Sequence, residues 1–73
     1  MFIREKRFEL KMTQMQLALK IGTTQFRISA IERGVTIPNS KEVKTIAKAL
    51  EIKLKDLELV PPLFPTVQAR VRR

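Results

Sequence analysis

The chain has 73 residues, the size of one small domain, and its 15 Lys and Arg against 7 Asp and Glu leave a net charge of +8. That balance favours a polyanionic partner, above all nucleic acid. The sequence holds no Cys and no His, which excludes disulfides, thiolate or imidazole metal sites and histidine-dependent catalysis. We therefore expect a binding protein rather than an enzyme, with no cofactor and no metal.

Apolar side chains recur at three- and four-residue steps along most of the chain, which predicts five short helices. The expected ranges are 3–11, 14–21, 25–33, about 40–50 and about 54–59. No strand-like alternation interrupts them. Residues 1–60 are therefore expected to form a compact, all-α, five-helix domain.

Residues that start and stop helices stand at the ends of these ranges. Thr13 and Thr24 are good N-caps for the second and third helices, and Gly22 and Gly34 follow the same two helices. Asn39, with a Glu three residues later, has the spacing of a capping box for the fourth helix. The boundaries of the central helices are thus expected from local chemistry alone.

Residues 61–73 differ from the domain and are expected to form a short basic tail. They carry three arginines and no acid, and the two prolines at their start stop the fifth helix. Residues 66–71 alternate polar and apolar, the period of a half-buried strand, yet the domain offers no partner edge. Three alternatives stay open: a disordered tail, strand exchange with a second subunit, or contact with the DNA backbone.

The segment 13–34 carries the strongest functional signal. It places two short helices around a three-residue turn, with Gly22 supplying the left-handed conformation and small Ala18 at the helix crossing. Ile28 and Ile31 are expected to hold the second of these helices on the first. This is the helix-turn-helix arrangement, in which the second helix enters the major groove of DNA.

The residues themselves resemble a known family. The run T-Q-x-x-L-A-x-x-x-G-T-T-Q-x-x-I-S-x-I-E-x-G-x-x-x-P, which starts at Thr13 and ends at Pro38, is similar to the Cro and phage-repressor helix-turn-helix family, also called the xenobiotic-response-element type. The resemblance covers roughly residues 3–59 and implies a lambda-repressor-like fold that binds DNA. The chain departs from the family pattern at Lys11, where glycine is frequent, and at Lys53, where a small cap is usual.

The third helix is expected to read bases. A Gln amide can pair with the N6 and N7 edge of adenine, an apolar side chain can contact the methyl group of thymine, and an Arg can reach guanine or a phosphate. The expected base contacts are Thr24, Gln25, Phe26, Arg27 and Ala30.

Phosphate contacts are expected around the reading helix, because such contacts are the commonest kind in protein–DNA interfaces. Family position implies a backbone contact for Gln14, which can also brace Gln25. The remaining candidates lie around the connection between the third and fourth helices. The expected phosphate contacts are Gln14, Arg33, Thr36, Lys41 and Lys44.

Two structural contacts are expected as well. Arg7 interrupts an inward face and Glu32 stands at the pairing position of the family, so the two should form a mostly buried ion pair. The last apolar residues exceed what a small core can hide, and an exposed apolar patch usually marks an interface. The expected dimer interface is Leu57, Leu59, Val60 and Leu63.

Together these features predict a sequence-specific regulator of transcription, acting as a homodimeric repressor on a double-stranded DNA operator. The alternatives are an antitoxin, which binds a toxin protein through the basic tail, and a restriction-modification controller. The family implies the cytoplasm of a prokaryote, or a phage protein. No membrane role is expected, because no apolar run approaches the eighteen or so residues of a span and the apolar face of the fourth helix is needed for the core.

Overall fold

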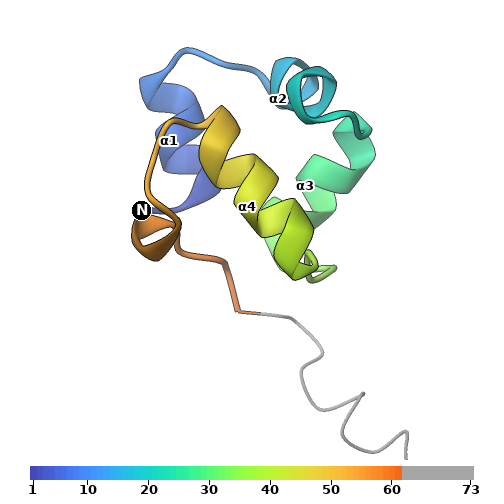
Figure 1. The fold of residues 1–73 in the computed structure, drawn as a ribbon. Coiled ribbons are helices and arrows are strands. Elements are labelled where there is room, and N and C mark those ends of the chain that lie inside the picture. The colour runs from blue at the N-terminus through green and yellow to red at the C-terminus, as the bar shows by residue number, and fades with distance from the viewer. Residues whose placement is uncertain (62–73) are drawn as a thin grey trace, which may run out of the picture.

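The computed structural model describes residues 1–61, and its helices follow one another around a single core (Figure 1). Within these 61 residues, four α-helices precede one short 3-10 helix. Their bounds are α1 Ile3–Glu9, α2 Gln14–Ile21, α3 Gln25–Arg33, α4 Ser40–Ala49 and the 3-10 helix Leu54–Asp56. The predictions made for residues 62–73, including the strand-like stretch, the toxin contact and Leu63, lie outside the described residues.

The two helices of the helix-turn-helix begin and end where local chemistry predicted. The Thr13 hydroxyl accepts the N–H of Gln16 at 3.0 Å, and the Thr24 hydroxyl accepts the N–H of Arg27 at 3.1 Å. Gly22 and Gly34 both have φ of 78°, the left-handed conformation expected at these helix ends. The turn between α2 and α3 is therefore fixed at both sides by residues suited to it.

The core is formed where α2, α3 and α4 meet. Its largest fully buried side chains are Leu17, Ile28 and Ile46 from these helices, and Leu50, the C-cap residue of α4. Ile3 of α1 joins the same cluster. Burial of side chains of this size contributes roughly 1.5–3 kcal/mol each, so this cluster is what holds α3 in place.

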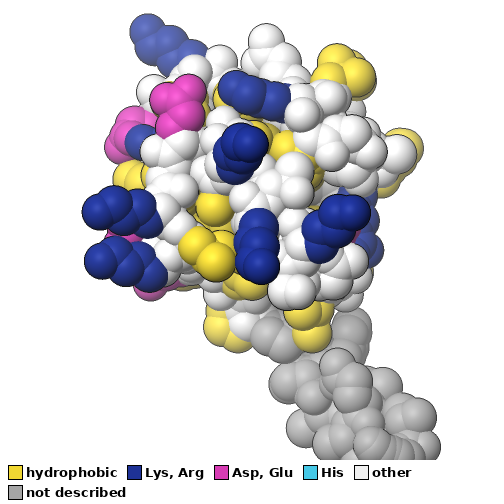
Figure 2. Space-filling model, viewed as in Figure 1, with side chains coloured by type: hydrophobic (Ala, Val, Ile, Leu, Met, Phe, Trp, Pro, Cys, Tyr) yellow, Lys and Arg dark blue, Asp and Glu magenta, His cyan; other side chains and the backbone are white. Residues whose placement is uncertain are grey.

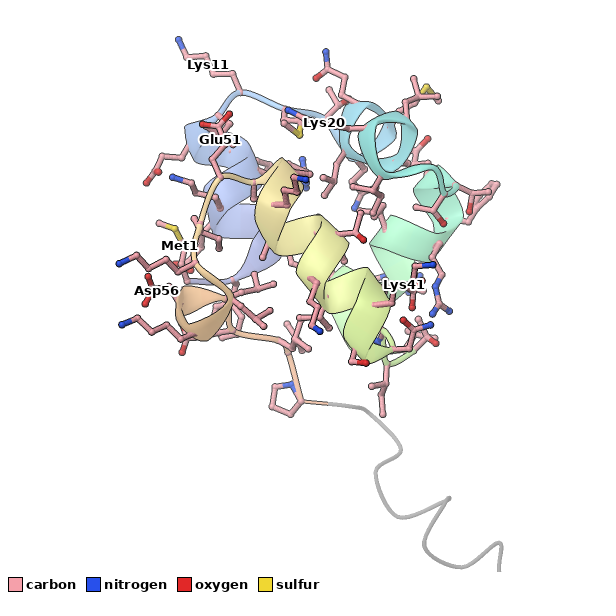
Figure 3. The ribbon with its side chains drawn as sticks, in the orientation of Figure 1. Met1, Lys11, Lys20, Lys41, Glu51 and Asp56 are labelled. Carbon is pink, nitrogen blue, oxygen red and sulfur yellow. The ribbon has the colours of Figure 1, made fainter. Side chains whose placement is uncertain are left out.

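The prediction of a fifth α-helix at 54–59 is wrong, because only residues 54–56 are helical. Leu57 is already extended, and the N–H of Glu58 donates to the carbonyl of Met1 at 2.8 Å. Phe2 and Glu58 form an isolated parallel bridge, and Met1 lies beside Asp56 (Figure 3). A helix this short cannot recover its nucleation cost, so pairing with the start of the chain prevails.

The first helix is also shorter than the predicted range of 3–11. It ends at Glu9 because Lys11 adopts a left-handed conformation with φ of 56°. The family often has glycine at this position, and glycine adopts the left-handed conformation easily. Lys11 adopts the same conformation although it has a side chain. Glu51 does the same after α4, with φ of 60° (Figure 3).

Candidate nucleic-acid interface

The outer side of α3 starts with an exposed polar residue and an exposed aromatic one. Gln25 is exposed, and Phe26 has 86% of its surface accessible, so its ring shields no neighbouring helix. Ile28 and Ile31 on the opposite side are buried. Thr24, just before the helix, is exposed and uses its hydroxyl as the N-cap. The structure therefore presents Thr24, Gln25 and Phe26 together at the first turn of α3.

Unlike Gln25 and Phe26, Arg27 is only partly exposed, and its guanidinium forms hydrogen bonds within the domain. Its Nε donates to Glu42 Oε2 at 3.0 Å and its Nη2 to Glu42 Oε1 at 2.7 Å, while Nη1 donates to the Thr36 hydroxyl at 3.2 Å. The hydrogen bonds from Arg27, followed by the one from the backbone N–H of Asn39, lower the pKa of Glu42. The hydrogen bonds to Glu42 in turn raise the pKa of Arg27. A base contact by Arg27 stays a prediction, and these contacts use three of its five N–H donors.

Arg7 and Glu32 are brought together as the sequence analysis expected. Arg7 Nε donates to Glu32 Oε2 at 2.8 Å and Nη2 to Oε1 at 3.1 Å, and both side chains are more than nine-tenths buried. Arg7 Nη1 also donates to the carbonyl of Met12 at 2.9 Å. The pair joins α1 to α3.

Gln14 belongs to the same network. Its amide nitrogen donates to Glu32 Oε1 at 3.1 Å, so the first residue of α2 is tied to α3. Within residues 1–61, no hydrogen bond joins Gln14 to Gln25. The expected phosphate contact of Gln14 stays a prediction, and its bracing partner is Glu32.

The other expected phosphate contacts fall on two sides of α3. Lys41 and Lys44 are exposed on one face of α4, and Thr36 lies half-buried in the connection before it. Lys41 lines a groove with Gly22 and Thr23 of the helix-turn-helix turn, and it is labelled in Figure 3. Basic side chains continue along α4, whereas acidic ones gather at the edge near α1 (Figure 2). These residues form one basic flank of α3.

The second flank lies toward α1. Arg33 is exposed, and its Nε donates to the Ser29 hydroxyl at 3.2 Å. Ser29 lies one helical turn after Gln25 and is half-buried. Ala30, the next residue of α3, is also half-buried. Sequence reasoning missed Ser29, although its spacing from Gln25 was the signal that could have found it. The structure therefore separates Arg33 from Lys41 and Lys44, which the sequence analysis had grouped.

The expected dimer residues are only partly available at the surface. Leu57 packs against the core, and Val60 lies against Gly34. Leu59 is 36% exposed. Met1 and Phe2, in the segment that pairs with Glu58, are also exposed. The sequence analysis had not considered these two apolar residues.

Comparison with known proteins gives this fold and surface a family. The family model described as helix-turn-helix matches residues 3–57. The chain therefore belongs to the helix-turn-helix family of the Cro and repressor type, a class of DNA-binding regulators, which confirms the resemblance seen in the sequence.

Curated relatives come from eukaryotes. The chain is 39% identical over 61 residues to Vegetative-specific protein H7 of Dictyostelium discoideum, covering 84% of this chain and 59% of the relative. It is 36% identical over 62 residues to Multiprotein-bridging factor 1 of Candida albicans and of Debaryomyces hansenii, covering 85% of this chain and 41% of each relative. The chain thus spans roughly half the length of the relatives it matches. No solved structure matches it significantly.

These relatives correct one expectation. A slime mould and two yeasts contradict the prediction of a prokaryotic or phage protein, which rested on where such domains are mainly found. The helix-turn-helix itself carries no mark of origin, because its spacing reflects helix packing and groove geometry. Within residues 1–61, none of the helices has the length and apolar content to cross a membrane.

Proposed function

We propose that this domain binds double-stranded DNA in a sequence-specific way, with the first turns of α3 in the major groove. The observation that carries the proposal is the exposure of Phe26, 86% accessible, beside exposed Gln25, on a helix whose opposite side is buried in the core. Both side chains stand in the first turn of the second helix of the helix-turn-helix, the part of such a helix that meets base edges. Thymine methyl groups and adenine edges in the major groove are suitable partners for this pair.

The proposed roles follow from position along α3. Gln25 reads adenine, Phe26 packs on thymine methyls, and Ala30 comes close to the groove wall one turn later. Thr24 lies at the helix start, where it caps α3 and borders the DNA. Arg27 is proposed to act chiefly as a positioning residue, because its guanidinium is occupied by Glu42 and Thr36.

The two basic flanks suit the two sugar-phosphate backbones that border a major groove. Lys41, Lys44 and Thr36 are proposed to contact one strand, and Gln14 and Arg33 the other. Phosphate contacts of this kind fix register and orientation but carry no sequence information.

We further propose that two copies act together on DNA and that the bound pair represses transcription. A single α3 reads only a few base pairs, and helix-turn-helix proteins commonly read two half-sites about one helical turn apart. The support is four exposed apolar side chains in residues 1–2 and 54–59, two segments that pair with each other: Met1, Phe2, Leu54 and Leu59. Four side chains fall short of the roughly 1,200 Å² that a stable interface buries, so pairing is expected on DNA rather than in dilute solution.

The decisive experiment is selection of bound sites from random duplexes with the wild type, Gln25→Ala and Phe26→Ala. We expect a wild-type consensus of two half-sites, and each variant should lose preference at its own base position. Lys55→Ala, an exposed basic change away from α3, serves as the control and should keep the consensus. If all four proteins select the same sequence, α3 does not read DNA. The domain would then function by binding proteins, as the name of the bridging-factor relatives suggests.

A further inference from the structure

We propose that α1 adds a separate phosphodiester-binding site to the DNA surface, formed by Arg4 and Arg33 and supported by Phe8. The site rests on the proposed function, because it extends the same interface. It lies on the flank of α3 toward α1, and neither Arg4 nor Phe8 belongs to the surface predicted from sequence.

One groove joins the residues of this site. Its lining includes Arg4 and Phe8 from α1, Gln14 from α2, and Ser29 and Arg33 from α3. The buried Arg7–Glu32 pair forms part of the same wall. The groove has a volume of about 260 Å³, below the roughly 300–1,000 Å³ of small-molecule sites but wide enough for a phosphate group.

The lining of this groove carries a net positive charge, with three arginines and one acid, Glu32. The carboxylate of Glu32 is paired with Arg7. Among residues 1–61, neither Arg4 nor Arg33 forms an ion pair. Arg33 uses only its Nε, toward Ser29, which leaves both of its Nη groups for another partner. The guanidinium groups of Arg4 and Arg33, which line the same groove, are therefore available to bind an anion.

Phe8 holds the arginines of α1 in place. The guanidinium carbon of Arg4 lies 5.2 Å from the centre of the Phe8 ring, and that of Arg7 lies 4.9 Å from it. Phe8 itself is 57% exposed, so its ring restrains Arg4 without burying it. A restrained guanidinium loses less entropy when it binds an anion.

The geometry of the donors favours phosphate. Guanidinium groups present paired N–H donors that match two phosphate oxygens, and a phosphate between two arginines receives both. Because Ser29 and Arg33 are on α3, an anion held here lies beside the DNA that α3 contacts. Free inorganic phosphate offers the same oxygen chemistry, so the experiment must separate the two sources.

The experiment uses the duplex selected by the wild type and measures binding affinity against salt concentration. The test variant is Arg4→Gln with Arg33→Gln, and the matched control is Lys53→Gln with Lys55→Gln, which removes two exposed charges outside α3 and α4. We expect the slope of log affinity against log salt to fall by about 0.9 in the test variant, the value for one lost phosphate contact. The control should keep the wild-type slope, and both variants should keep the wild-type melting temperature.

Neutral methylphosphonates placed singly along the duplex then locate the contact. One position should weaken binding of the wild type but not of the Arg4→Gln, Arg33→Gln variant. Phe8→Leu should lower affinity by a smaller factor and leave the slope unchanged, because it removes the restraint and not the charge. Inorganic phosphate should not raise the melting temperature of the wild type more than that of the test variant.

The outcomes separate this site from the proposed function. If the wild type selects no sequence, the proposed function fails and the site falls with it. If selection depends on Gln25 but the slope of the test variant is unchanged, the site alone is overturned. A phosphate-dependent rise in melting temperature that requires Arg4 and Arg33, with no change in the DNA slope, would show a free-anion site and would also overturn it.

Discussion

The guanidinium of Arg27 and the carboxylate of Glu42 form a two-pronged ion pair that joins the first turn of α3 to the first turn of α4. Glu42 also accepts the N–H of Asn39 at 2.9 Å, so one carboxylate both caps α4 and orients it against α3. The pair thereby fixes where Lys41 lies relative to α3. Its two side chains are 34% and 27% exposed, so solvent screens it.

Replacing Glu42 by Gln should lower stability at neutral pH and flatten its decline in acid. The pKa of Glu42 is below its ordinary value of 4.5, so its stabilisation is complete above that value and is lost as the pH falls through the lower folded pKa. Gln keeps the capping box but not the ion pair, and the loss should be about 1 kcal/mol or less. Urea unfolding of both proteins from about pH 7 to 3 measures this. Parallel curves would show that the pair contributes nothing.

Replacing Arg7 by Met should destabilise the domain far more, by about 3–5 kcal/mol, because Glu32 is left charged and buried without its partner. Replacing both Arg7 and Glu32 by Met should restore much of that loss, since no uncompensated charge then remains. Thermal and urea unfolding of the single and double variants make the comparison. A double variant less stable than Arg7→Met would contradict it.

Substituting Ala for each glycine should separate backbone strain from packing. At Gly22 an added Cβ meets nothing within 4 Å, so Gly22→Ala should cost only the left-handed conformation, about 1–2 kcal/mol. At Gly34 the same Cβ would lie 2.7 Å from the carbonyl oxygen of Pro61. Gly34→Ala should therefore cost clearly more, as urea unfolding would measure. Equal losses would mean that residues 60 and 61 move aside freely.

Removing the positive charge at Lys41 should weaken binding to all duplexes alike. Lys41→Gln on the selected duplex is expected to reduce the salt slope by about 0.9, the effect of one phosphate contact, while the selected consensus stays the same. Lys55→Gln is the control, and fluorescence titration at several salt concentrations is the measurement. A changed consensus would instead place Lys41 near a base.

Local chemistry was sufficient to predict α2 and α3, because Thr13, Thr24, Gly22 and Gly34 each act within one turn of their own position. The end of α1 was not predicted correctly, because the lysine at position 11 does not indicate a left-handed conformation in the sequence. The wrong prediction of a fifth α-helix has a cause outside the local sequence. Its apolar spacing is helical, but Glu58 pairs with residues at the other end of the domain.

The candidate site divides in the same way. Exposure of Gln25 and Phe26 followed from helical spacing, and the Arg7–Glu32 pair from the resemblance together with the inward position of Arg7. The Arg27–Glu42 pair was not foreseen, because Glu42 was already explained as a cap and no spacing rule connects residues on different helices. Which charged side chains pair between helices depends on how the helices cross. The periodicity of the sequence does not predict that crossing.

The packing of Val60 and Pro61 against Gly34 has a consequence for protein engineering. It places the last described residues at the end of α3, next to Arg33. A reporter or effector domain fused after residue 61 would thus start at the edge of the proposed DNA surface, and a long flexible spacer would be needed to keep it from obstructing the duplex. The same geometry makes this position a good attachment point for a probe that must sense DNA binding, since a dye there would change its surroundings when the groove is filled.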